Sequence, residues 1–172
     1  MRGTTLAATA VAVATLAACG NSTSPTGNPG ESSSCSVTIT GGGSAAGTYD
    51  CKPATTVWSS ANNTGGFSFV VTAPAINVAI GWTGEPAGGA HHKQSDAGAQ
   101  GGVTVTTGSG ASTQVWAATV SPANGTYDLY FSGVSNTVST ANGKAYVADG
   151  TLTATLAPLS GQSGNITVSV TF

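Results

Sequence analysis

The sequence TLTATLAPLSGQSGNITVSVTF, residues 151–172, contains two stretches in which apolar and polar residues alternate, separated by the turn-forming sequence GQSG at 161–164. Alternation with a period of two is typical of a β-strand that buries one face and exposes the other. The sequence therefore predicts two strands that form an antiparallel hairpin. Its apolar positions are Leu152, Ala154 and Leu156 in the first strand, and Ile166, Val168, Val170 and Phe172 in the second.

Three earlier segments follow the same rule, and no segment after residue 34 has a convincing helical period. Turn sequences separate the strands: Ser121–Gly125 is expected to join strands at 113–120 and 126–133 as a hairpin. Asn142-Gly143 has the same role before a strand at 144–148. The apolar positions of the three segments are Phe67, Phe69 and Val71; Ile76, Val78, Ile80 and Trp82; and Tyr127, Leu129 and Phe131.

About eight to ten short strands at this spacing predict one all-β domain over residues 35–172, an antiparallel β-sandwich of the immunoglobulin-like or jelly-roll kind. Its charge content is low: 6% of the 172 residues are charged, against about 25% in an average domain. Arg2 is the only arginine, with three lysines and six acidic residues. Because no basic stripe is present, we expect no nucleic-acid partner.

The first 19 residues combine one positive charge, Arg2, with an apolar run from Leu6 to Ala18 and a cysteine. The run is too short and too rich in alanine to span a membrane, and this order of features is that of a secretory signal peptide over residues 1–18. Leu16-Ala17-Ala18-Cys19 resembles the lipobox of bacterial lipoproteins. The resemblance implies cleavage before Cys19 and acylation of that cysteine, so that the lipid attaches the protein to a membrane. The alternative is an ordinary secretory signal with a chance cysteine.

Residues 19–34 comprise the lipidated Cys19 and a Ser/Gly/Pro/Thr-rich stretch, GNSTSPTGNPGESSS, that lacks large apolar side chains. This composition predicts a flexible tether. In lipoproteins of bacteria with two membranes, a residue other than Asp after the cysteine, here Gly20, implies export to the outer membrane. Residues 150–172 also resemble, by pattern, the terminal hairpin of bacterial surface lipoproteins, which implies no activity. We expect a lipid-anchored protein of the cell envelope.

The two remaining cysteines are predicted to form a disulfide. Folding the chain about Gly43 places Cys35 opposite Cys51 and Val37 opposite Tyr49. An exported compartment is oxidising, so these thiols should join. A metal site built on the two cysteines would lack two further ligands.

Residues 84–101 have no buried pattern and are expected to form a structureless loop, in which Lys93 is the first site of tryptic cleavage in the native protein. A loop of this length is either functional or solvated. Weak candidates for a metal site are His91, His92 and Asp96, with Glu85 as a further oxygen donor. No third residue lies at a sequence spacing typical of a metal-binding motif, so we expect no bound metal and no cofactor.

Catalytic motifs are absent from the sequence, and the protein is not expected to be an enzyme. Two aromatic residues are candidates for ligand binding. Trp116 alternates with Val115 and Ala117 and so points to the other face of its strand from these two residues. Tyr130 lies on the face of its strand opposite to the predicted buried face. Exposed rings on a sheet stack on sugars or anchor a protein partner. The alternative is that both faces of that sheet are covered and the rings belong to the core.

These observations favour a lipid-anchored lipoprotein whose β-sandwich is a surface binding or structural module, with an envelope protein or a glycan as its possible partner. The first alternative is a carbohydrate-binding or carbohydrate-active accessory domain that uses exposed aromatic rings. The second is a metal-binding lipoprotein that uses the segment around His91 and His92.

Overall fold

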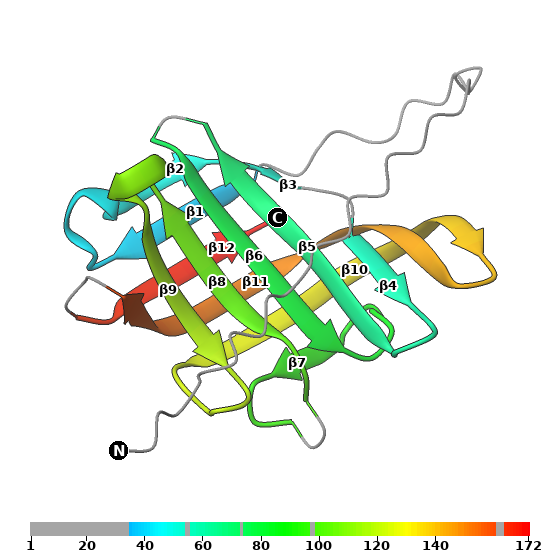
Figure 1. Ribbon diagram of the computed structural model, residues 1–172. Coiled ribbons are helices and arrows are strands. Elements are labelled where there is room, and N and C mark those ends of the chain that lie inside the picture. The colour runs from blue at the N-terminus through cyan, green and yellow to red at the C-terminus, as the bar shows by residue number, and fades with distance from the viewer. Residues whose placement is uncertain (1–34, 54–55, 73, 97–98, 161–163) are drawn as a thin grey trace, which may run out of the picture. The chain divides into compact units, whose positions relative to one another are not determined.

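The computed structural model describes residues 35–172 except 54–55, 73, 97–98 and 161–163 (Figure 1). The predicted signal peptide, Cys19 and the tether over 19–34 lie outside the described residues, as does most of the GQSG turn. Among the described residues there are twelve β-strands, two single-turn 3₁₀ helices and no α-helix. The prediction of an all-β antiparallel sandwich is confirmed.

The elements follow one another with short connections. They are β1 (Ser36–Thr40), η1 (Gly43–Ala45), β2 (Gly47–Asp50), β3 (Lys52–Pro53), β4 (Thr56–Ser59), β5 (Thr64–Val71), β6 (Ile76–Thr83), β7 (His91–Lys93), β8 (Gly102–Thr107), η2 (Gly110–Ser112), β9 (Gln114–Thr119), β10 (Thr126–Thr140), β11 (Gly143–Ser160) and β12 (Ile166–Thr171).

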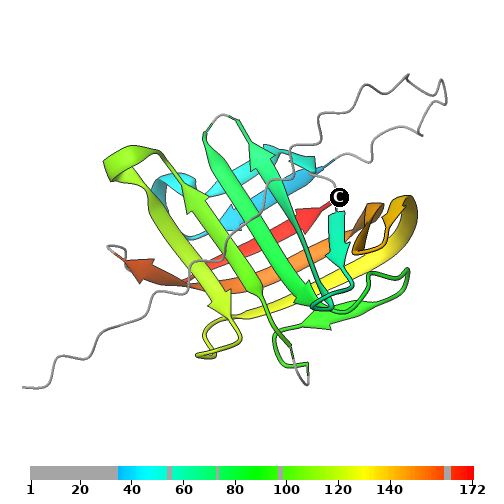
Figure 2. The same ribbon diagram turned by 45° about the vertical axis from the view of Figure 1, so that its right-hand side comes forward.

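The strands form two layers that face each other, as Figures 1 and 2 show. One layer has the order β4-β5-β6-β8-β9, with β3 paired to β5, and the other has the order β2-β1-β12-β11-β10, with β7 at the edge of β10. The strands of one layer run across the direction of those in the other (Figure 1). This is the orthogonal way of packing two sheets, in which a strand that belongs to both layers makes the corner.

The long strand β11 is that shared strand. Its first part, Gly143–Tyr146, pairs with β4, and its last part pairs with β9 through Ala157, Pro158 and Ser160. Its central part pairs with β10 on one side and with β12 on the other. The first layer is therefore hydrogen-bonded to β11 at both of its edges, and the two layers enclose one core.

The core contains every apolar position that the alternation predicts, and each of these side chains is buried. A cluster of aromatic rings lies at its centre: Phe67 packs against Phe69 at 4.8 Å between ring centroids, against Phe172 at 5.2 Å and against Trp82 at 5.5 Å. Trp82 in turn packs edge-on against Phe131 at 5.4 Å. Edge-to-face pairs of this kind add about 0.5–1.5 kcal/mol each beyond the area that they bury.

The predicted disulfide is confirmed. Cys35 and Cys51 are bonded, with their Cα atoms 5.0 Å apart. The register of the hairpin is also the predicted one, because Val37 is paired with Tyr49. The tight turn is possible because Gly41 and Gly42 have φ angles of 86° and 73°, a region that glycine occupies readily.

The prediction of a hairpin across Ser121–Gly125 is wrong, although the predicted turn is present. Thr119 and Asn124 exchange two backbone hydrogen bonds, but β9 then pairs with β8 and β11 while β10 runs in the other layer. Gly125 allows this corner: its φ is 68°, and a Cβ atom there would lie 2.4 Å from the carbonyl oxygen of Thr155. The turn therefore connects two layers rather than two neighbouring strands. In contrast, the predicted hairpins before β11 and β12 are confirmed by their pairing.

The expected structureless loop between residues 84 and 101 is wrong in its central part. His91–Lys93 form β7, which pairs with Asp128, Leu129 and Tyr130 of β10. Before it, Pro86 is buried, and Gly89 N donates a hydrogen bond to Phe131 O at 2.7 Å. Three residues are too few for alternation to be recognised in a sequence. The strand forms because its backbone pairs with the edge of β10.

Candidate functional site

The outer surface at the edge of β10 carries a group of polar and aromatic side chains that we call the Tyr130 cluster: His91, Lys93, Asp128 and Tyr130. Nδ1 of His91 lies 2.8 Å from Oδ1 of Asp128, and Nζ of Lys93 lies 3.3 Å from Oδ2 of the same carboxylate. The imidazole packs on the ring of Tyr130 at 4.7 Å between centroids. Because a carboxylate only accepts, Nδ1 of His91 carries a proton in this contact.

Tyr130 is thus placed where the sequence suggested, partly exposed on the outward face of β10. One side of its ring is occupied by His91. The carboxylate of Asp128 is shared by two cationic or potentially cationic neighbours, which holds the cluster together at the surface. Ion pairs with this degree of exposure contribute about 0–1 kcal/mol each, so the cluster defines a surface chemistry more than it stabilises the fold.

His92, the next residue, points to the opposite side of β7. Its Nδ1 donates to the carbonyl oxygen of Thr83 at 3.0 Å, and its ring packs against Trp82 and Phe131 at 5.8 and 5.7 Å between centroids. Nε2 is buried and has no hydrogen-bond partner among the residues that the structure describes. Burial lowers the pKa of His92 below 6.5, and the neighbouring His91 acts in the same direction; the hydrogen bond to Thr83 and the charge of Asp96 oppose the shift.

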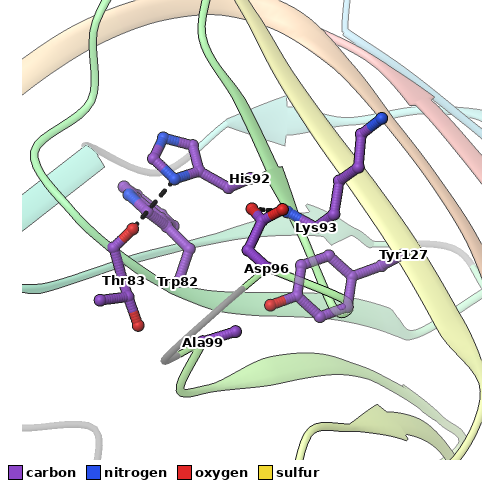
Figure 3. Close-up of a pocket in the computed structure, with 7 residues that line it drawn as sticks. All are labelled: Trp82, Thr83, His92, Lys93, Asp96, Ala99 and Tyr127. Carbon is purple, nitrogen blue, oxygen red and sulfur yellow. Dashed lines mark hydrogen bonds between the residues drawn. The ribbon is translucent and has the colours of Figure 1, made fainter.

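A small pocket of about 90 Å³ lies beside His92 (Figure 3). Ligand sites usually have about 300–1,000 Å³, so this space suits water molecules rather than a sugar or a cofactor. Asp96 lies between His92 and Tyr127 in Figure 3, and its Oδ2 accepts a hydrogen bond from the backbone N of Lys93 at 2.7 Å. The residues that line the pocket are Trp82, Thr83, His92, Lys93, Asp96, Ala99 and Tyr127.

The candidate metal ligands do not come together. Consecutive residues of a strand point to opposite faces, so His91 binds Asp128 outside while His92 packs inside. Asp96 accepts a hydrogen bond from the backbone N of Lys93, the last residue of β7, and Glu85 binds groups of β11. Within the described part of the chain, no three His, Cys, Asp or Glu side chains form a group that could hold a metal ion. The four candidate ligands, His91, His92, Asp96 and Glu85, thus have separate partners in the structure.

Trp116 is not a surface residue, so it is not a ligand-binding residue, and for this ring the alternative of a place in the core is confirmed. Its side chain is 1% exposed, and it lies opposite the fully buried Val105 in the β8–β9 ladder. Ala117 and Ala118 are buried as well, because β9 lies at the corner where it pairs with both β8 and β11. Because both faces of this strand are covered, the alternation of its residues does not indicate an exposed face.

A second surface group, which the sequence did not indicate, lies around a different tryptophan. We call it the Trp58 cluster: Trp58, Asn63, Glu85, Lys144 and Tyr146. Nζ of Lys144 lies over the indole ring of Trp58, 5.7 Å from its centroid, and donates to Oε1 of Glu85 at 2.7 Å. The hydroxyl of Tyr146 donates a short hydrogen bond to the same oxygen. The indole Nε1 donates to Oδ1 of Asn63 at 3.3 Å.

The electrostatics of the Trp58 cluster keep its charges paired. The hydrogen bonds from Lys144 and Tyr146 lower the pKa of Glu85, in that order of importance. Burial, together with the hydrogen bond to Glu85, raises the pKa of Tyr146 to about 12. At neutral pH the cluster therefore contains one carboxylate, one ammonium group and a neutral phenol.

One signal in the sequence precedes this cluster but does not identify it: Trp58 stands directly before the turn-rich sequence Ser59–Gly65. In the structure, Asn63 of this turn is the one described residue other than glycine with a positive φ, 54°. Glu85 and Lys144 are 59 positions apart in the chain. Only the pairing of β4 with β11 and the path of the segment after β6 bring them together.

Comparison of the chain with protein-family models, with curated proteins and with solved structures gives no match. No helix within the described residues is long and apolar enough to cross a membrane.

Proposed function

We infer that the chain is an exported lipoprotein, anchored in the cell envelope through Cys19, whose β-sandwich acts as a surface binding or structural module without catalytic activity. The observation that carries this proposal is the contrast among the three cysteines of the chain. Cys35 and Cys51 are bonded to each other, as expected of a protein in an oxidising compartment. Cys19 is left over, and it stands in the lipobox-like sequence Leu16–Cys19.

A binding role is supported by how the surface side chains are used. In the Tyr130 and Trp58 clusters the carboxylates of Asp128 and Glu85 are each held by cationic neighbours. A general acid at neutral pH needs a carboxyl group with a raised pKa, whereas the pKa of Glu85 is lowered. Ion-paired groups beside an aromatic ring are suited to recognition instead. In bacteria with two membranes, the anchor would lie in the outer membrane, because Gly20 rather than Asp follows Cys19.

The experiment that tests the anchor compares the full chain with its Cys19→Ala variant in a bacterial host fed with labelled palmitate. The parent chain is expected to incorporate label and to stay with the membranes after a carbonate wash. Cys19→Ala is expected to incorporate none. The double variant Cys35→Ala, Cys51→Ala is the matched control: it loses the other two cysteines and is expected to be labelled normally. A parent chain without label, or equal labelling of Cys19→Ala, overturns the proposal.

A further inference from the structure

The Trp58 cluster combines an aromatic ring with polar atoms that are already oriented. Trp58 is half-buried at the end of β4, where its strand partner on β5 is Gly65 and its partner on β11 is Lys144. Gly65 has no side chain, and the indole of the buried Trp82 occupies the space that one would need. The ammonium group of Lys144 covers part of the Trp58 ring. An indole that is fixed by its neighbours and still reaches solvent is suited to stack on the apolar face of a ligand ring.

Glu85 and Asn63 each use one side-chain atom for hydrogen bonds within the cluster, and each has a second polar atom that can bind a ligand. Oε1 of Glu85 accepts from both Lys144 and Tyr146, while Oε2 has no protein partner among the described residues. Because an indole N–H only donates, its contact on Asn63 is the amide oxygen, which leaves the amide NH₂ as a donor. The cluster thus offers a free acceptor and free donors around one ring.

The backbone of Asn63 joins the two parts of the cluster. Its φ of 54° is in the left-handed region, which is uncommon outside glycine although asparagine tolerates it. In this conformation its side chain binds Trp58 and its carbonyl oxygen accepts a hydrogen bond from Gly84 N at 2.8 Å, next to Glu85. One residue therefore positions both the ring and the carboxylate, and such conformations tend to occur where function requires them.

The charges of the cluster indicate the class of ligand. Glu85 and Lys144 form a pair, so the cluster has no net charge, and the π-face is already occupied in part by a cation. A charged ligand would have to break the pair or compete with Lys144, whereas a neutral ring with several hydroxyl groups would use the free acceptor and donors together. Proline-rich peptides also stack on aromatic rings, but their grooves are lined by several of them. This cluster presents only the ring of Trp58, because Tyr146 is buried.

We propose that the Trp58 cluster is a binding site for a neutral pyranose unit of a cell-surface or environmental polysaccharide. The sugar ring stacks on Trp58, and its hydroxyl groups bind Oε2 of Glu85 and the NH₂ of Asn63. This inference rests on the proposed function, because it names the ligand of an exported binding module.

The test uses the purified full chain on an array of neutral oligosaccharides of glucose, mannose, galactose, arabinose and N-acetylglucosamine, with uronic-acid oligosaccharides and a polyproline peptide printed beside them. Titration calorimetry with the best neutral ligand follows. Trp58→Ala is expected to weaken its affinity at least about tenfold, which corresponds to 1.4 kcal/mol. Trp58→Phe, which keeps a ring, is expected to retain most of the affinity.

Val57→Ala is the matched control. Val57 neighbours Trp58 on β4, is 53% exposed and points to the other face, so its removal should leave the affinity unchanged. If Trp58→Ala does not fold, Glu85→Gln replaces it, with the same expected loss.

Unchanged affinity of the folded Trp58 or Glu85 variant overturns the inference, as does binding only to the charged glycans or to the peptide. Loss of sugar binding in Tyr130→Ala with full binding in Trp58→Ala also overturns it, and moves the site to the Tyr130 cluster. None of these results affects the palmitate labelling of Cys19, so failure of this site and failure of the envelope anchor remain distinguishable.

Discussion

The indole ring of Trp82 occupies the space that a side chain at position 65 would need: a Cβ atom on Gly65 would lie 2.2 Å from Cζ2 of Trp82. The two residues are direct partners in the β5–β6 ladder. Trp82 is 1% exposed and is held by a hydrogen bond from its Nε1 to Gly84 O at 3.0 Å. Since the ring has no room to retreat, glycine at position 65 is a packing requirement of the core.

Gly65→Ala is therefore expected to destabilise the domain by at least about 2 kcal/mol, the usual range for overpacking of a core being about 1–3 kcal/mol. Urea unfolding followed by the tryptophan fluorescence measures this change. Gly81→Ala is the control on the neighbouring strand, because a Cβ atom there would make only ordinary contacts, the nearest at 3.6 Å. Equal effects of the two substitutions would contradict the packing argument.

The Cys35–Cys51 bridge is expected to contribute about 3 kcal/mol, the value for a closed loop of about 15 residues when the unfolded chain is the state that gains freedom. Replacing both cysteines by alanine should lower the urea midpoint accordingly. Reduction of the parent protein should give the same shift, and digestion without reduction should yield one linked peptide pair. An unchanged midpoint after confirmed reduction would show that the bridge does not stabilise the fold.

Stability is expected to decrease as the pH falls below about 6.5, because the pKa of His92 is lower in the folded than in the unfolded protein. As the pH falls, His92 takes up its proton first in the unfolded chain. The contribution of His92 to the free energy of unfolding is therefore complete above pH 6.5, and it decreases as the pH falls towards the pKa of His92 in the folded protein. The loss is at most about 1.4 kcal/mol per pH unit for one proton. Thermal unfolding at intervals between pH 7.5 and 5 measures it.

The charged or titratable groups near His92 are Asp96, His91, Lys93 and Tyr127. His92→Gln is expected to flatten the pH profile, while His91→Gln, the adjacent residue on the outer face, is expected to preserve it. Protonation of Glu85 also lowers the stability of the fold, but only at lower pH, because the pKa of this carboxyl group is below 4.5. A His92→Gln chain as sensitive to pH as the parent would exclude His92 as the cause.

Native trypsin is expected to leave the described domain uncut, in contrast to the expectation from sequence that Lys93 is cleaved first. Lys93 lies in β7, paired with Asp128. Lys144 is paired with Trp58 on one side and Ser139 on the other, and Lys52 precedes Pro53. A protease needs a stretch of unpaired chain, so cleavage requires local unfolding. Mass spectrometry of timed digests, with the denatured chain as control, checks this; rapid cleavage after Lys93 would show that β7 detaches readily.

Local regularities in the sequence determined the strands and their buried faces. The alternation in residues 67–71, 76–82 and 166–172 predicts the correct inward side chains, because neighbouring positions of a strand always point to opposite faces. The β1–β2 register and the Cys35–Cys51 bond were also predictable, since three glycines and a short turn leave few ways to pair two adjacent strands. Each of these features depends on residues that are close together in the chain.

The tertiary structure alone decided which side chains reach the surface and which of them meet. Trp116 is buried and Trp58 is not, because β9 is covered on both faces at a corner while β4 ends beside a turn. His91 and His92 separate because the edge of β10 turns their segment into a strand. Glu85 meets Lys144 across 59 positions because β4 pairs with β11 and brings the two layers together. Alternation indicates which face of a strand is buried in the core. It does not indicate whether the opposite face of that strand is covered by another part of the chain or exposed to solvent.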